Sequence, residues 1–283
     1  MNFNLSLHLE KKLIFYINSI LILLMIILFL FNIEIKYFFY INVLLTLVLS
    51  FIFFQKSKRV SKYLILTNLF IFFYFLYPII AEYLYNLLGN ESYIFILFYN
   101  VLIAYLFLTF SGMHKTFLGD IKKTNLKVIL LTILIGSVLG FFFFLVREPV
   151  PNTLLSSSFD VLIFYTLLLA LSEQIIFSGF LYNIYKKLNN QHEAYFQVAT
   201  IFVLFHLLRF ENLIITYFRN FDVLYLYLIT MYYILLFIFM ITALYLYNFK
   251  YKHYRGNFVY PVLLHFVTDL ILFLFLIYSV GYV

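Results

Sequence analysis

The chain has 283 residues, of which 65% are hydrophobic and only 11% charged, and its mean hydropathy is +1.03. This composition excludes an ordinary soluble domain, because so much apolar surface has to face lipid. The lack of cysteine excludes disulfides, thiolate metal ligands and a cysteine nucleophile. The net charge of +7 indicates basic cytoplasmic loops that orient a membrane protein, and no nucleic-acid partner is expected.

The predicted elements are all helices. A membrane-spanning helix needs about 20 predominantly apolar residues. The first apolar run follows Lys11 and Lys12 and is longer than the roughly 7–15 residues of a signal-peptide core, so we expect a retained span. By this measure nine spans are predicted, at residues 13–33, 38–54, 63–88, 93–111, 128–146, 159–185, 194–210, 223–248 and 258–280.

The basic residues orient these spans. If the N-terminus is cytoplasmic, fifteen of the nineteen Lys and Arg residues fall in inside segments. The segments assigned to the outside hold only four, Lys36, Arg147, Arg209 and Arg219. This asymmetry favours an all-α, polytopic membrane helical bundle with a cytoplasmic N-terminus. Together with the Phe, Ile, Tyr, Asn and Lys bias, which is typical of an AT-rich genome, it favours a multi-pass protein of a bacterial plasma membrane.

Ionisable residues deep inside predicted spans are costly and are therefore functional candidates. Five residues meet this condition: Glu82, Glu173, His206, His265 and Asp269. Glu82 lies near the outer end of its span, where a solvated structural role is the simpler interpretation. Counted at about 1.5 Å per residue, the other four lie roughly 15–21 Å from the cytoplasmic side. Because they belong to three separate spans at a similar depth, we expect them to share one polar cavity.

Each of these side chains also has a plain structural interpretation. A lone buried histidine commonly bridges helices by hydrogen bonds. A lone buried glutamate is commonly neutral. His265 and Asp269 are spaced i, i+4, so they share a helix face, and the carboxylate can fix the tautomer of the imidazole.

The candidates fall in three short segments. These are "EQIIFSG" beginning at Glu173, "FVLFH" ending at His206, and "HFVTD" running from His265 to Asp269. In this order the segments resemble the signature of the CPBP family, the CAAX-protease and bacteriocin-processing intramembrane proteases, also called Abi. The family motifs read E-E-x-x-F-R-G, F-x-x-x-H, and H-x-x-x-N or H-x-x-x-D. The resemblance covers about the last 130 residues.

The resemblance implies a mechanism of peptide hydrolysis. Glu173 and His206 would activate a water molecule, while His265 and Asp269 would lie around the oxyanion. An ionised carboxylate cannot donate a hydrogen bond, so Asp269 would have to be protonated or would orient His265. Family members are often labelled metalloproteases, and two histidines with two carboxylates can bind zinc. The cofactor prediction therefore stays open between none and one zinc ion.

The first motif departs from the family pattern at two positions on one helix face. Gln174 and Ser178 replace a glutamate and an arginine, so both charges of an expected ion pair are absent. Losing both avoids an unpaired buried charge, which would cost roughly 3–5 kcal/mol. We interpret the change as a compensated replacement of a structural pair near the site, and we expect Gln174 to form a hydrogen bond with Ser178.

The sequence thus predicts two parts, membrane helices of unassigned role in residues 1–157 and a CPBP-like protease core in residues 158–283. The function favoured is an intramembrane endopeptidase acting on peptides or membrane proteins within the lipid bilayer. The altered first motif leaves open a catalytically inactive scaffold or regulator of a membrane partner. Buried Glu, Asp and His residues also occur in proton-coupled transporters. The sequence shows no paired broken helices or repeat halves that would favour transport.

Overall fold

The computed structural model describes residues 2–30, 62–71, 92–112, 124–146, 159–207, 223–249 and 257–280, together with the single residues 44, 48, 73, 83, 86 and 87. All regular secondary structure in these residues is helical, as the sequence predicts. The predicted second span lies outside the described residues, apart from residues 44 and 48. The same holds for Glu82 and for the four basic residues assigned to the outer side, Lys36, Arg147, Arg209 and Arg219.

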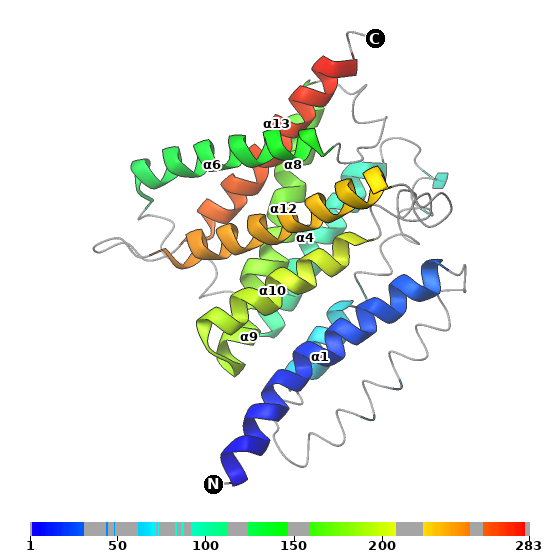
Figure 1. Cartoon of the computed structure of the whole chain (residues 1–283), viewed down its shortest axis with the longest axis vertical. Helices are drawn as coiled ribbons and strands as arrows, with labels where there is room; N and C mark the ends of the chain where they lie inside the picture. Colours follow the sequence, from blue (N-terminus) through cyan, green and yellow to red (C-terminus); the bar gives the residue numbers. More distant parts are fainter. Residues whose placement is uncertain are drawn as a thin grey trace.

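Figure 1 shows these helices as a bundle in which segments distant in sequence lie beside one another. A shorter helix spans Lys62–Ile71. The main helices are α1 (Asn2–Leu30), α4 (Ser92–Phe110), α6 (Leu126–Leu145), α8 (Phe159–Gln174), the π-helix η3 (Ile175–Leu181), α9 (Tyr182–Leu188), α10 (Gln191–His206), α12 (Val223–Asn248) and α13 (Val259–Val280).

Four helical segments are long and apolar enough to cross a membrane, counting only the described part of the chain. They are Leu126–Leu145, Phe159–Leu188, Leu226–Asn248 and Val259–Ser279. Helix α10, which covers the predicted seventh span, has 16 residues and ends at His206, four residues before the predicted end. At about 1.5 Å per residue it is roughly 24 Å long, which is short for a bilayer core of about 30 Å.

Asparagine residues mark the starts of three helices. Asn125 accepts a hydrogen bond from the Lys127 amide at 2.9 Å, and Asn190 accepts one from the Glu193 amide at 2.8 Å. Asn257 accepts one from the backbone amide two residues later, at 3.0 Å. Each side chain satisfies a backbone N–H that has no partner in the first helical turn. These caps separate α6, α10 and α13 from the polar segments before them.

The predicted span 159–185 is not one uninterrupted α-helix. Between α8 and α9, the seven residues of η3 form a π-helix, in which the Tyr182 amide bonds the Phe177 carbonyl five residues earlier. The Asn183 side chain donates a hydrogen bond to the Gly179 carbonyl at 2.6 Å, which satisfies a backbone acceptor where the helix regains the α form. All seven residues are buried. A π-helical segment is rare and is commonly found at functional sites.

Two glycines allow α6 to cross close to α13, as seen in Figure 1. A Cβ atom on Gly136 would lie 3.1 Å from both the Leu264 carbonyl oxygen and the Val267 side chain. A Cβ atom on Gly140 would lie 2.5 Å from the Thr268 carbonyl oxygen. Small residues four apart permit such close backbone approach between membrane helices. The crossing fixes α13, and with it the segment that carries His265.

Packing extends across the predicted boundary between residues 157 and 158. Phe107 of α4 contacts Phe70 of the Lys62–Ile71 helix and Phe180 of η3, with ring centroids 5.7 and 5.6 Å apart. A single hydrophobic cluster includes buried residues of α1, α4, α6, η3, α10, α12 and α13. The helices before residue 157 therefore form part of the packing that encloses η3.

Candidate active site

Four polar side chains from three helices meet beside η3. Glu173 comes from the end of α8, His206 is the last residue of α10, and His265 and Asp269 lie in α13. A Glu173 carboxylate oxygen, Oε2, lies 3.7 Å from His206 Nε2 and 3.8 Å from His265 Nε2. Asp269 Oδ2 lies 3.3 Å from His265 Nε2. The four side chains meet as the sequence predicts, but only His206, His265 and Asp269 line the adjacent cavity and Glu173 does not; their catalytic roles remain predictions.

Burial separates the four groups. Glu173, His206 and His265 are 3–5% exposed, whereas the Asp269 side chain is 17% exposed. A buried ionised group is costly unless it is paired or hydrogen-bonded. The close approach of carboxylates and imidazoles supplies such pairing within the bundle.

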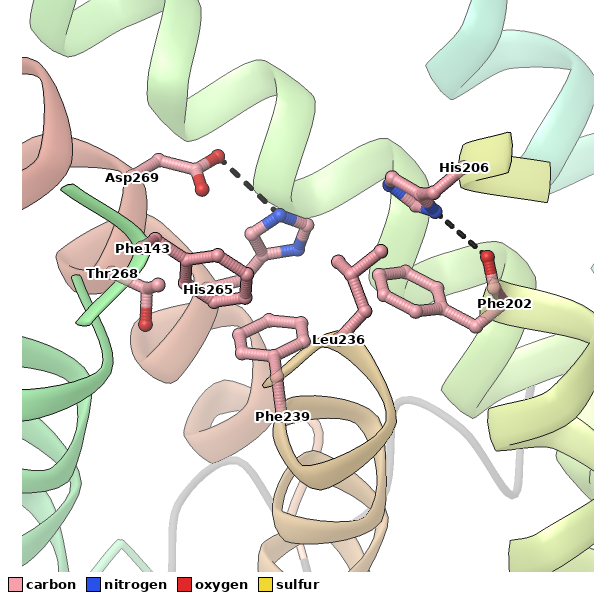
Figure 2. A pocket seen from close by; sticks show the side chains of 8 residues that line it. All are labelled: Phe143, Phe202, His206, Leu236, Phe239, His265, Thr268 and Asp269. Carbon is pink, nitrogen blue, oxygen red and sulfur yellow. Dashed lines mark hydrogen bonds and ion pairs between the residues drawn. The ribbon is translucent and has the colours of Figure 1, made fainter. Parts of the chain in front are cut away.

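The His206 ring is held by its own helix. Its Nδ1 lies 2.8 Å from the Phe202 carbonyl oxygen one turn earlier (Figure 2). A carbonyl can only accept, so Nδ1 carries a proton and donates. In the neutral ring Nε2 therefore has the lone pair, and this atom faces Glu173. The Phe202 ring packs against the imidazole, with centroids 4.2 Å apart.

The His265 ring has the opposite arrangement. The Gln174 side-chain amide lies 3.2 Å from its Nδ1, while carboxylate oxygens of Asp269 and Glu173 approach its Nε2. An ionised carboxylate can only accept, so Nε2 carries the proton. Nδ1 is then the acceptor for the amide N–H of Gln174. Figure 2 shows the contact between His265 and Asp269 as a dashed line.

Gln174 and Ser178 form the hydrogen bond that the sequence predicts. Ser178 Oγ donates to Gln174 Oε1 over 2.6 Å, and both residues are fully buried. This bond directs the amide N–H₂ of Gln174 toward His265. The pair is thus more than the neutral structural replacement expected from the sequence, because it contacts the site directly.

A small cavity lies beside these groups; it is partly open to the outside and has room for about one water molecule. One side is polar and is formed by His206, His265, Asp269 and Thr268. The remaining wall is apolar and is shown in Figure 2. It consists of Phe143 from α6, Phe202 from α10, and Leu236 and Phe239 from α12. A site of this kind can place a water molecule against the histidines.

Sequence reasoning found only part of this lining. Phe143, Leu236 and Phe239 were not predicted, because they belong to apolar spans in which lipid-facing and cavity-facing residues look alike. The Phe239 ring meets the His265 ring edge-on, with centroids 5.0 Å apart. The motif residues Phe177 and Phe202 also contact each other, with ring centroids 4.9 Å apart.

The donor set does not fit the zinc site that the sequence left open. Within the described part of the chain, no three His, Asp or Glu side chains are arranged to hold a metal ion. The hydrogen bonds explain this, because the protonated Nε2 of His265 faces Asp269 and its Nδ1 is engaged by Gln174. With His265 engaged, Glu173, His206 and Asp269 remain, and these three side chains are not arranged to hold one ion, whereas catalytic zinc sites use three protein ligands.

No family model, curated protein or solved structure matches the chain. The interpretation of the site therefore depends on its residues and geometry. Chemically, the arrangement places an imidazole acceptor and an imidazole donor on either side of one carboxylate.

Proposed function

We propose that this protein is an intramembrane endopeptidase of the CPBP type, hydrolysing peptide bonds of membrane-associated peptides or proteins. One observation carries the proposal: two buried imidazoles, oriented by different hydrogen-bond partners, lie 3.7 and 3.8 Å from the Glu173 carboxylate. Peptide hydrolysis needs both a base for water and a donor for the oxyanion. The two histidines are suited to these two roles.

Glu173 and His206 act on the water. The carboxylate oxygen and the lone-pair nitrogen of His206 are both acceptors and lie 3.7 Å apart. A water molecule bonded to both directs its two O–H groups at them, which leaves an oxygen lone pair for attack. As that oxygen bonds to the peptide carbonyl carbon, its proton passes to Glu173. The same proton is then delivered to the leaving amine as the C–N bond breaks.

His265 acts on the carbonyl oxygen. His265 lines the cavity, and its Nε2–H can donate to the negative charge that develops when the carbonyl becomes tetrahedral. Asp269 receives the same N–H in the resting state, so it orients the ring without needing to be protonated. Of the two roles considered for Asp269 in the sequence analysis, the geometry supports this orienting role.

The proposed membrane arrangement keeps nine spans and a cytoplasmic N-terminus in a bacterial plasma membrane. Polar pairs at one end of the bundle support it. Lys12 Nζ lies 3.3 Å from Glu193 at the start of α10, and Lys186 Nζ donates to Asn248 at 3.0 Å. All four residues lie at or beside segments that the charge asymmetry assigns to the cytoplasm.

The natural absence of cysteine makes this topology directly testable. A Lys187→Cys variant carries one exposed thiol after the long span, whereas Tyr278→Cys carries one near the far end of α13. We expect a membrane-impermeant maleimide to label the Tyr278 variant on intact cells. It should label the Lys187 variant only after permeabilisation. The reverse pattern would mean the opposite orientation.

The activity is tested by comparing membrane peptidomes of cells producing the wild-type protein or Glu173→Ala. We expect at least one substrate to accumulate uncut in the variant, because the proposed base is missing. Glu193→Ala provides a matched control, since it removes a carboxylate in the first turn of α10, about 20 Å along that helix from His206. Its peptidome should equal that of the wild type.

Other outcomes identify the alternative functions. If Glu173→Ala and His206→Ala are expressed normally and leave both peptidome and cellular phenotype unchanged, the chain is better explained as a scaffold or regulator. If wild-type proteoliposomes show proton-driven flux that Glu173→Ala removes, transport replaces proteolysis as the interpretation. A substrate that accumulates in Glu173→Ala but not in Glu193→Ala supports the endopeptidase.

A further inference from the structure

Three hydrogen-bonded groups form a line from η3 to the oxyanion side of the site. Ser178 Oγ donates to Gln174 Oε1, and the Gln174 amide reaches His265 Nδ1. On the far side of the ring, Nε2 faces Asp269 Oδ2 at 3.3 Å. All three residues of the line are at most 5% exposed. Little bulk water can therefore substitute for a missing hydrogen bond.

We propose that Gln174, oriented by Ser178, is a positioning residue that holds His265 in the neutral tautomer with its proton on Nε2. The amide N–H₂ has no lone pair to offer, so it bonds only to an unprotonated Nδ1. Ser178 fixes the direction of the amide by donating to its oxygen. The reversed amide would place its carbonyl against Nδ1 and would move the imidazole proton there. The lone pair of His265 Nε2 would then point at a lone pair of the Asp269 carboxylate.

A carboxylate at position 174 would change the ring's charge. A glutamate could only accept, so Nδ1 would have to be protonated while Asp269 and Glu173 still require a proton on Nε2. His265 would become an imidazolium facing three carboxylates. The other ionisable group in the site is His206 on α10, and α12 contributes the apolar Phe239. Gln174 is thus the element that keeps this imidazole neutral.

The catalytic meaning of this tautomer rests on the proposed function. The tautomer itself can be measured without any substrate. We would record imidazole nitrogen NMR spectra of the full chain in lipid nanodiscs with ¹⁵N-labelled histidine. The chain has six histidines, and the His265 signals are assigned by their loss in His265→Gln. His206 serves as an internal reference, because its Nδ1 is held by a backbone carbonyl.

For the wild type we expect His265 to show an unprotonated Nδ1 and a protonated Nε2. In Gln174→Glu the Nδ1 signal should shift to the protonated range, while His206 keeps its wild-type pattern. If Gln174→Glu does not fold, Gln174→Met keeps the side-chain length without hydrogen bonding. In that variant His265 should populate both neutral tautomers.

A protonated Nδ1 on His265 in the wild type would overturn the proposal, as would unchanged His265 signals in either Gln174 variant. These results are distinguishable from failure of the proposed function. If Gln174 does not hold His265 in one tautomer, the peptidome comparison between the wild type and Glu173→Ala is unaffected. An inactive scaffold, in turn, would still show the wild-type His265 pattern.

Discussion

The two histidines of the site are held in different ways. His206 is oriented by the Phe202 carbonyl, four residues away in the same helix. His265 is oriented by Gln174, 91 residues away in the sequence, and by Asp269 in its own helix. The first arrangement needs only a formed α10. The second also needs α8, η3 and α13 to dock in one register.

Because of this difference, the two sides of the site should respond to different substitutions. Changes in the packing of distant helices should disturb the His265 side of the site and leave the His206 tautomer in place. Changes to α10 itself should act mainly on the His206 side. Because the proposed base is His206 with Glu173, and the proposed oxyanion donor is His265, the two sides can also be separated kinetically.

The largest expected effects come from removing the imidazoles. His206→Ala should lower the turnover of the peptide identified with Glu173→Ala by about 10²–10⁴-fold, the range for general acid–base catalysis, because the water loses one of the two acceptors that position it. His265→Ala should lower it by about 10²–10³-fold, the range for one oxyanion donor. His192→Ala, an exposed histidine at the start of α10, should retain wild-type turnover.

Turnover within about tenfold of the wild type in either His206→Ala or His265→Ala would break this division of roles. The measurement is kcat on purified variants in nanodiscs. Unfolded variants are excluded by requiring thermal melts that match the wild type.

A second effect, on stability, concerns the pair that supports His265. Ser178→Arg should lower the free energy of unfolding by about 3–5 kcal/mol, because it buries a charge at a fully buried position. Adding Gln174→Glu should recover part of this loss, since the arginine then gains a carboxylate partner. Unfolding of the two single variants and the double variant in mixed micelles tests the coupling.

If the two substitutions add without coupling, residues 174 and 178 do not act as a pair. The expected coupling energy for groups in contact is about 0.5–3 kcal/mol. Thr200→Arg provides a control for the arginine itself, because Thr200 is a half-buried residue of α10 whose hydroxyl donates to the Phe196 carbonyl of its own helix, 2.9 Å away.

The smallest expected effect lies at the crossing of α6 and α13. Gly140→Ala should lower the free energy of unfolding by about 1–3 kcal/mol, since its Cβ would approach the Thr268 carbonyl oxygen to 2.5 Å. Gly136→Ala, with nearest atoms at 3.1 Å, should change it by less than about 1 kcal/mol, because a gain in helix propensity offsets the tighter contact.

The same pair of variants sharpens the comparison of the two histidines. Gly140→Ala should shift the imidazole signals of His265 and leave those of His206 unchanged. Equal shifts at both rings would show that the two sides of the site respond as one unit.

Much of the site could be predicted from motif spacing and depth. Glu173, His206, His265 and Asp269 are rare polar residues in apolar spans, so their meeting could be inferred from the sequence alone. The Gln174–Ser178 bond was also predictable, because i, i+4 spacing places both on one helix face. The roles of the apolar residues could not be predicted, because an apolar side chain in a membrane helix gives no sign of which way it faces.

By itself, the sequence determined an all-helical chain with apolar segments long enough to cross a membrane and a buried set of ionisable groups, because apolar length and isolated charges leave few alternatives. Tertiary structure decided the rest. The π-helical η3, the close crossing at Gly136 and Gly140, and the link from Gln174 to His265 all depend on contacts between helices. A proton position on an imidazole is set by its hydrogen-bond partners, and the partner of His265 Nδ1 comes from another helix.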